Sequence, residues 1–268
     1  MEPSKDSGSP PLKAPAGLRG RLVALAGGTG GLGAALARSL AGEGASLVIG
    51  YYHDKERAAQ LLRECGPRAL AVQADLRTPA GRAALLAAAQ DLYGLVVLLG
   101  DPAREQEEET LRRSLEVNFL APCLLAREAA ERMRACGTPG AIVLLASMQA
   151  VHVFEGAVSY GAPKAALIHA ARVLAKEYGG AANIRVNVVA PGVTTAGMAA
   201  ASVRSGKYQR YLDNGVIARY GRPEDVSRAV RFLLEPDNYV TGQVLTVDGG
   251  LTLRRDFQGQ PSPRPFRA

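Results

Sequence analysis

The sequence has little of what marks several large protein classes. Its 268 residues include no tryptophan, only 5% aromatic residues and only three cysteines. Cys65, Cys123 and Cys136 are odd in number and match no metal-binding or redox spacing, so we interpret them as ordinary thiols of a reducing compartment. We therefore expect a cytoplasmic protein without a metal site.

Two further absences bear on the partners of the protein. No segment approaches the run of about 20 apolar residues that a membrane-spanning helix needs, and residues 1–17 lack the basic-then-apolar order of a secretion signal. The net charge is +7, but four arginines against one aspartate after Leu253 account for +3 of it. The remaining charge is spread without basic clusters or interleaved aromatics. We expect neither a membrane nor a nucleic acid as partner.

Apolar runs of strand length alternate with stretches of helical spacing along most of the chain. The expected strands are residues 21–26, 46–51, 68–73, 95–99, 141–146, 184–190 and 243–247. This alternation predicts an α/β fold, a single Rossmann-type, doubly wound parallel sheet of seven strands with helices on both faces. Residues 18–253 are expected to form this domain, and residues 1–17 and 254–268 to be disordered tails.

A glycine-rich turn, Gly27 to Gly33, stands between the first expected strand and the helix that follows it. Glycines let backbone N–H groups approach a pyrophosphate, and the helix N-terminus supplies partial positive charge. The spacing fits the ordinary dinucleotide fingerprint from Gly28 through Gly30 to Gly33, and also a wider version from Gly27 through Gly31 to Gly33. Glycine-rich turns also serve plain strand–helix connections, but this context favours dinucleotide binding.

A second candidate site combines Tyr160, Lys164 and Ser147. Tyr160 and Lys164 lie four residues apart in an Ala-rich run of helical spacing, so the phenol and the ammonium are expected side by side. A free tyrosine titrates at about pH 10, and a neighbouring cation lowers that pKa. Ser147 from another segment can hold the substrate oxygen. The trio suits a general acid for carbonyl reduction or a general base for alcohol oxidation.

Several of these features follow strands directly. The glycine turn, Asp75, Ser147 and Pro191–Gly192 each stand just after an expected strand. Ligands of parallel sheets bind beyond the carboxyl ends of the strands. We therefore expect these residues to converge on one edge of the sheet.

At this point the chain resembles the short-chain dehydrogenase/reductase family, and most closely its branch of 3-oxoacyl-[acyl-carrier-protein] reductases. The resemblance covers about residues 18–253 and rests on motifs in the family's order. These motifs are Gly27-Gly-Thr-Gly-Gly-Leu-Gly33, Asp75-Leu76, Val117-Asn118, Ser147 with Tyr160-Gly-Ala-Pro-Lys164, Asn187-Val-Val-Ala-Pro-Gly192, and Thr241-Gly-Gln with Asp248-Gly-Gly250. Together they are far more specific than any one of them.

The resemblance implies a catalytic role for four residues. Tyr160 is the proton donor or acceptor, Lys164 lowers its pKa and binds the nicotinamide ribose, and Ser147 orients the substrate oxygen. Asn118, in a locally disturbed helix, holds a water that links Lys164 to bulk solvent.

The resemblance also implies a set of cofactor contacts. Asp75 binds the adenine, Leu76 packs beside it, and residues 191–193 meet the carboxamide. The expected cofactor-binding residues are Gly27, Thr29, Gly30, Gly31, Leu32, Gly33, Tyr51, His53, Asp75, Leu76, Tyr160, Lys164, Pro191, Gly192, Val193 and Thr195.

Three positions depart from the family pattern. Ala26 replaces the threonine before the first glycine, and Leu98-Leu99-Gly100-Asp101 replaces the Asn-Asn-Ala-Gly that supports the adenosine ribose. Ala196 replaces a threonine, with Thr194 and Thr195 nearby as substitutes.

Cofactor choice depends on the end of the second strand, where an acidic residue would bind the ribose 2′-OH and favour NAD(H). Tyr51, Tyr52 and His53 stand there, followed by Asp54 and Lys55. We expect NADP(H), with NAD(H) as the alternative.

The expected activity is NAD(P)(H)-dependent hydride transfer between nicotinamide and a ketone or secondary alcohol, with a 3-oxoacyl substrate, possibly carrier-bound, as the favoured case. The expected pocket lining is Met148, Gln149, His152, Phe154 and residues 194–211. The alternative is a non-catalytic dinucleotide-binding sensor or scaffold on the same fold, motivated by residues 98–101. The resemblance further implies a homo-oligomer, a tetramer or a dimer.

Overall fold

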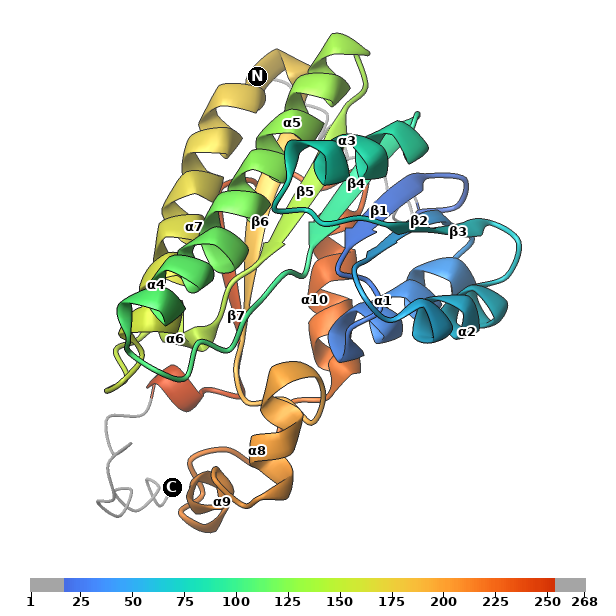
Figure 1. Ribbon diagram of the computed structural model, residues 1–268. Coiled ribbons are helices and arrows are strands. Elements are labelled where there is room, and N and C mark those ends of the chain that lie inside the picture. Colours follow the sequence, from blue (N-terminus) through green and yellow to red (C-terminus); the bar gives the residue numbers. More distant parts are fainter. Residues whose placement is uncertain (1–16, 254–268) are drawn as a thin grey trace, which may run out of the picture.

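In the computed structural model, which describes residues 17–253, seven parallel strands form one sheet (Figure 1). The strands are β1 (Leu22–Ala26), β2 (Ser46–Tyr51), β3 (Ala69–Gln73), β4 (Leu92–Val97), β5 (Gly140–Leu145), β6 (Ile184–Pro191) and β7 (Val244–Val247). Their order, β3-β2-β1-β4-β5-β6-β7, confirms the predicted doubly wound sheet. The two predicted tails lie, apart from Gly17, outside the described residues.

Two layers of helices enclose the sheet (Figure 1). The layer of α1, α2 and α10 covers one face, and the layer of α3, α4, α5 and α7 covers the other. These helices are α1 (Gly31–Gly42), α2 (Lys55–Cys65), α3 (Pro79–Ala88), α4 (Glu108–Leu115), α5 (Ala121–Ala135), α7 (Val158–Tyr178) and α10 (Pro223–Leu234). None of the helices in the described part is long and apolar enough to cross a membrane.

The two faces of the sheet carry alternate residues of the same strands. In β4, Leu95 and Val97 pack into the core beneath α5 and α7, whereas Val96 packs into the core beneath α1 and α10. Side chains of a strand point to opposite faces in turn, and both faces are buried here, so the strand is apolar throughout. This explains why the central strands have continuous rather than alternating hydrophobicity.

The fourth strand begins and ends earlier than the sequence predicts. It runs from Leu92 to Val97 rather than over residues 95–99, and it includes Gly94. A Cβ at Gly94 would lie 3.1 Å from Val23 Cγ2 and 3.3 Å from Leu234 Cδ2, so close packing favours glycine there. Leu98 N donates the last hydrogen bond to Ala26 O, at the end of β1, and the chain then leaves the sheet.

β1 lies at the topological switch point of the sheet. The chain passes from β1 through β2 to β3 in one direction, and from β4 through β5 and β6 to β7 in the other. A crevice therefore opens beyond the carboxyl ends of β1 and β4.

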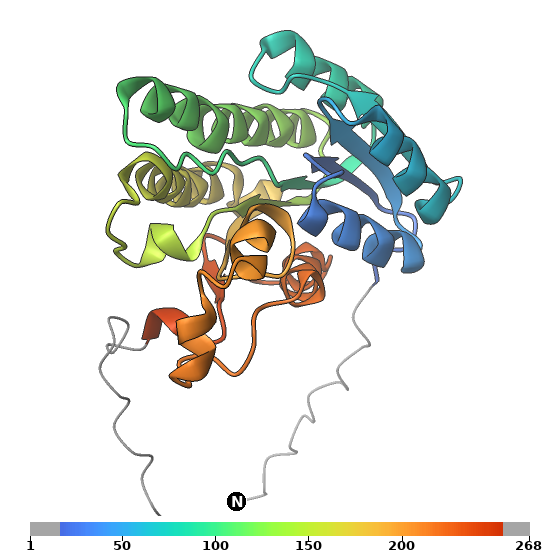
Figure 2. The same ribbon diagram turned by 60° about the horizontal axis from the view of Figure 1, so that its bottom comes forward.

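The polar segment between β6 and α10 forms two short helices rather than an irregular loop. They are α8 (Ala200–Arg204) and α9 (Gln209–Asp213), and they stand out from the sheet in both views (Figures 1 and 2). Tyr211 and Ile217 anchor this segment in a small apolar cluster with Met148, which follows β5. The segment thus closes over the carboxyl end of the sheet.

Candidate active site

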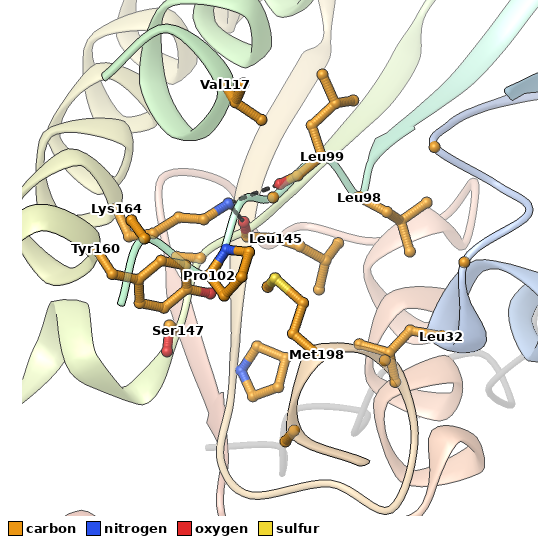
Figure 3. A pocket seen from close by; sticks show the side chains of 18 of the residues that line it. Leu32, Leu98, Leu99, Pro102, Val117, Leu145, Ser147, Tyr160, Lys164 and Met198 are labelled. Atoms are coloured by element: carbon orange, nitrogen blue, oxygen red, sulfur yellow. Dashed lines mark hydrogen bonds between the residues drawn. The ribbon is translucent and has the colours of Figure 1, made fainter. Parts of the chain in front are cut away.

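A cleft of about 680 Å³ opens at the switch point, beyond the carboxyl ends of the strands. The glycine turn after β1 lines one side of it, and the residues after β5 and β6 line the other. Figure 3 shows Leu32 on one side of the cleft, Ser147, Tyr160 and Lys164 on the other, and Pro102 and Met198 between them. The residues that follow these strands thus lie together at one edge of the sheet, as the sequence predicts.

Several positions of the glycine turn have no room for a side chain. Gly27 has φ +79°, in the left-handed region that glycine tolerates. A Cβ at Gly28 would lie 2.8 Å from Ile49 Cγ2, and one at Gly33 would lie 2.6 Å from Gly28 O. The turn places the N-terminus of α1 against the cleft, where Gly30 is its N-cap and no side chain caps it. First-turn N–H groups without helical partners suit a pyrophosphate.

Tyr160 lies in the first turns of α7, where it is half-buried and lines the cleft together with Ser147. Ser147 follows β5 and caps the short helix α6 (Met148–Val151), its Oγ accepting from Gln149 N at 3.2 Å. Burial raises the pKa of Tyr160 to about 12, because desolvation of the phenolate outweighs the opposing effect of the nearby Ser147 hydroxyl.

Lys164 is buried in the wall of the same cleft, with 2% of its surface exposed. Its Nζ donates to Leu99 O at 2.8 Å and to Leu145 O at 2.9 Å, contacts drawn in Figure 3. Burial lowers its pKa to about 7. Desolvation is thus the largest influence on the pKa of both groups, and the amine of Lys164 donates to strand-end carbonyls. That Lys164 lowers the pKa of Tyr160 stays a prediction.

The contact with Leu99 bears on the departure at residues 98–101. The hydrogen bond to Lys164 uses the main-chain oxygen of Leu99, so it does not depend on the asparagine side chains of the family pattern. Asn118 braces the same segment: its Oδ1 accepts from Asp101 N at 3.0 Å and its Nδ2 donates to Asp101 O at 2.9 Å.

Asn118 lies in a π-helical turn, Glu116–Leu120, that joins α4 to α5. Its Nδ2 also donates to Ser114 Oγ at 2.8 Å, and Ser114 Oγ donates to Ser159 O. Ser159 O needs this donor because Pro163, four residues further along α7, has no N–H. The Asn118 side chain is thus committed to the loop after β4 and to α4, and it does not line the cleft.

Asp75 lines the cleft beyond β3, but its carboxylate already has a partner. Arg77 Nε donates to Asp75 Oδ1 at 2.9 Å and Arg77 Nη2 donates to Oδ2 at 2.7 Å, an arrangement that lowers the pKa of Asp75. The same Nη2 donates to Tyr52 Oη at 3.0 Å. An adenine contact through Asp75 would have to share the carboxylate with Arg77.

The segment after β6 approaches the cleft from the other side. Gly192 N donates to Val247 O at 2.9 Å, and a Cβ at Gly192 would lie 2.6 Å from Asp248 Cβ. Thr194 Oγ1 donates to Ala196 O at 2.9 Å and also lines the cleft. Thr195 N donates to Gly221 O at 2.8 Å, which turns this residue away.

Most of the predicted site residues line one cleft. They are Gly27, Gly30, Gly31, Leu32, Gly33, Tyr51, Asp75, Leu76, Ser147, Tyr160, Lys164, Pro191, Gly192 and Val193, with Met148 and Gln149 of the expected substrate pocket. Predicted residues that do not line it are Thr29, His53, Asn118, His152, Phe154 and Thr195. Cleft residues that were not predicted as site residues include Tyr52, Arg77, Pro102, Ala103, Arg104 and Glu155. Tyr52 and Arg77 follow recognised strand-end positions, a signal that could have found them.

Comparison with known proteins gives matches over nearly the whole described chain. A family model described as enoyl-(acyl carrier protein) reductase matches residues 26–252. The 3β-hydroxysteroid dehydrogenase 1 of Eggerthella lenta is 32% identical over 254 residues, which cover 90% of this chain and 97% of the relative. The cis-4-hydroxycyclohexanecarboxylate dehydrogenase of Sinomonas cyclohexanicum is 35% identical over 246 residues, covering 87% and 96%.

A solved structure adds a likeness in fold. It is a 7α-hydroxysteroid dehydrogenase in complex with NADH and 7-oxo glycochenodeoxycholic acid, with a TM-score of 0.79 and 29% sequence identity. The match covers 87% of this chain and 95% of that one.

Proposed function

Because this chain belongs to the short-chain dehydrogenase/reductase family, we propose that Tyr160, Ser147 and Lys164 catalyse its hydride transfer between a nicotinamide dinucleotide and a ketone or secondary alcohol. The observation that carries the proposal is that Tyr160, Ser147 and a buried lysine line the same cleft as the glycine turn. When bound, the dinucleotide supplies the hydride for ketone reduction and accepts it in alcohol oxidation.

In the reductive direction Tyr160 acts as general acid. With a pKa of about 12 its phenol is protonated at neutral pH and can pass its proton to the oxygen of the substrate. Ser147 donates a hydrogen bond to the same oxygen and stabilises its developing charge. Lys164, whose pKa is about 7, is poised to exchange a proton near neutral pH within the wall of the cleft.

We infer that the glycine turn binds the pyrophosphate and that NADP(H) is preferred over NAD(H). The end of β2 presents Tyr51 and Tyr52 to the cleft instead of an acidic residue. Arg77 stands beside Tyr52 and adds a guanidinium to the same wall. No carboxylate at the end of β2 therefore opposes a 2′-phosphate.

The substrate is assigned here as a small ketone or secondary alcohol, with a 3-oxoacyl thioester as the first case to test. The relatives named above act on cyclic alcohols according to their names, so cyclic ketones form the second group. We further propose a homo-oligomer in the reducing cytoplasm, where Cys65, Cys123 and Cys136 stay as the free thiols that they are in the structure.

The alternative, a non-catalytic dinucleotide-binding scaffold, was motivated by the altered segment after β4. That argument for a non-catalytic protein is weak, because Lys164 donates to the main-chain oxygen of Leu99, an interaction that does not depend on the side chain at position 99. Binding of a dinucleotide without turnover of any ketone or alcohol would favour this alternative.

The test is the Tyr160→Phe variant, which removes the proposed acid and little volume. Its kcat for ketone reduction, followed as dinucleotide absorbance at 340 nm, should fall by about 10²- to 10⁴-fold, with the dinucleotide Kd unchanged. Tyr220→Phe is the matched control, since the buried Tyr220 Oη has no hydrogen-bond partner among the described residues. Full activity in Tyr160→Phe would contradict the mechanism.

A further inference from the structure

Two basic side chains stand at the cleft without a carboxylate partner. Arg104 lies after β4 and Lys207 lies between α8 and α9, and both line the cleft and are exposed. Neither forms an ion pair within residues 17–253. The carboxylates that line the cleft are Asp75, which is paired with Arg77, and Glu155. The substrate half of the cleft therefore has two unpaired cations and one anion.

The loop that carries Arg104 is held on both sides of it. Before it, Asp101 Oδ1 accepts from Ala103 N at 2.8 Å, and Asp101 Oδ2 accepts from Arg113 Nε at 2.8 Å. After it, Gln106 Nε2 donates to Gly156 O at 2.8 Å. Arg104 is thus an exposed cation on a braced loop.

Lys207 belongs to the opposite wall. Its Nζ lies 5.7 Å from the ring centroid of Tyr208, and Tyr208 lines the cleft and stacks on Tyr211 with ring centroids 6.0 Å apart. Lys207 and Tyr208 therefore line the same cleft as Arg104 and Tyr160.

The cleft that holds these cations and Tyr160 also has apolar lining. Pro102, Ala103, Met198 and Ala199 contribute to it. An apolar body can fill this part while a charged end reaches the cations.

We propose that the substrate is an apolar ketone or secondary alcohol with an anionic group remote from the reacting oxygen, and that Arg104 and Lys207 bind this anion. The proposal rests on the proposed function and specifies its substrate class. Asp101 and Gln106 position Arg104 and are not themselves contacts. The anion can be a carboxylate of the substrate itself or a phosphate of a thioester carrier, which have the same recognition chemistry.

The experiment compares two pairs of ketones that differ in charge and share the reacting carbonyl. One pair is 4-oxocyclohexanecarboxylate and its carboxamide, and the other is acetoacetyl-CoA and the uncharged acetoacetyl-N-acetylcysteamine. For each pair, kcat/KM is measured with NADPH and with NADH in the wild type, in Arg104→Gln, in Lys207→Gln and in the double variant. Arg172→Gln and Lys176→Gln remove equal charge from exposed positions of α7 that do not line the cleft and serve as controls.

We expect the wild type to prefer the charged member of at least one pair by about tenfold or more, mainly through KM. Each single variant should lose about threefold of that preference and the double variant nearly all of it, whereas the controls keep it. Glu155→Gln should increase the preference, because it removes the opposing charge. The pair that responds identifies the source of the anion, carboxylate or carrier phosphate.

Three results would overturn the proposal. Equal kcat/KM within both pairs would reject the anionic substrate while leaving the proposed oxidoreductase function intact. A preference that persists in the double variant would reject these two side chains as the anion site. Absence of turnover of all four ketones with either dinucleotide would count against the proposed function and reject this proposal with it.

Discussion

The amine of Lys164 is buried in the interior of the protein, where it donates hydrogen bonds to two main-chain oxygens instead of pairing with a carboxylate. Leu99 O and Leu145 O accept its hydrogen bonds at the ends of β4 and β5. Carbonyl oxygens stabilise the protonated amine less than a full negative charge does, so desolvation lowers its pKa to about 7 from its ordinary 10.5. The lysine therefore costs stability when it is protonated, and this cost depends on pH.

The direction in which stability changes with pH follows from the lowered pKa of Lys164. Between pH 7 and 10.5 the unfolded chain binds the Lys164 proton while the folded chain has released it, so the wild type gains stability as pH rises. Relative to Lys164→Met, which has no such proton, the free energy of unfolding of the wild type should increase by about 2 kcal/mol from pH 7.5 to 9.5. Urea denaturation at several pH values measures it.

Lys176→Met is the control for this prediction, because Lys176 is exposed on the same helix, α7. The control should follow the pH dependence of the wild type. Parallel stability curves for the wild type and Lys164→Met would show that the buried amine keeps its proton over the whole range.

For individual residues, the sequence predicted which side chains lie in one cleft but not which hydrogen bonds they form. The i, i+4 spacing of Tyr160 and Lys164 and the strand-end position of Ser147 brought the three side chains to one cleft. The partners of Lys164 are main-chain oxygens of distant strands, which no side-chain pattern encodes. The sequence did not identify Arg104 as a cleft residue. It is the first residue of a charged run, 104–109, and the acidic part of that run is typical of a solvent-exposed surface.

At the scale of the structural elements, the glycine turn packs closely against the segment that follows β6. A Cβ at Gly31 would lie 2.6 Å from Gly197 N and 3.2 Å from Ala196 Cβ. Both contacts are with the backbone or the first side-chain atom, so neither can rotate away. The first turn of α1 and residues 196–197 must therefore shift together if Gly31 is replaced.

Gly31→Ala should accordingly weaken dinucleotide binding and leave the fold intact. We expect the Kd, measured by fluorescence titration, to rise by about tenfold or more, because a misplacement of about 1 Å is costly at such sites. Gly42→Ala is the matched control in the same helix, with open space around its added Cβ. It should keep the wild-type Kd and raise stability by about 0.5–1 kcal/mol. Equal Kd values for both variants would contradict the proposed role of the turn.

The strands were predictable because their apolar runs are clear, and their predicted and observed bounds differ by at most three residues. The exceptions involve tertiary contacts. β4 begins at Leu92 because Gly94 fits between Val23 and Leu234, a reason that a propensity pattern does not contain. Helices α8 and α9 hold together through a local cluster around Tyr211, although their residues look polar in sequence.

For the whole molecule, several apolar residues of the α3, α4, α5 and α7 layer stand in solvent, as Phe232 of α10 does in the other layer. Leu115 at the end of α4, Leu120 at the end of the π-helical turn and Val173 in α7 are 42%, 48% and 40% exposed. These elements belong to the layer of α3, α4, α5 and α7 on one face of the sheet (Figure 1). Exposed apolar side chains gathered in one layer are typical of an association surface.

We predict that this layer forms an interface of the proposed homo-oligomer. Light scattering should give a dimer or tetramer for the wild type and a smaller species for the double variant Leu115→Glu/Leu120→Glu. In a symmetric interface both subunits contribute the same surface, so each introduced carboxylate is present on both sides and the like charges repel. Leu70→Glu is the control: Leu70 is 44% exposed on β3, the edge strand of the sheet, where charge is tolerated. A monomeric wild type would contradict the oligomer, and an unchanged mass in the double variant would exclude this layer as the interface.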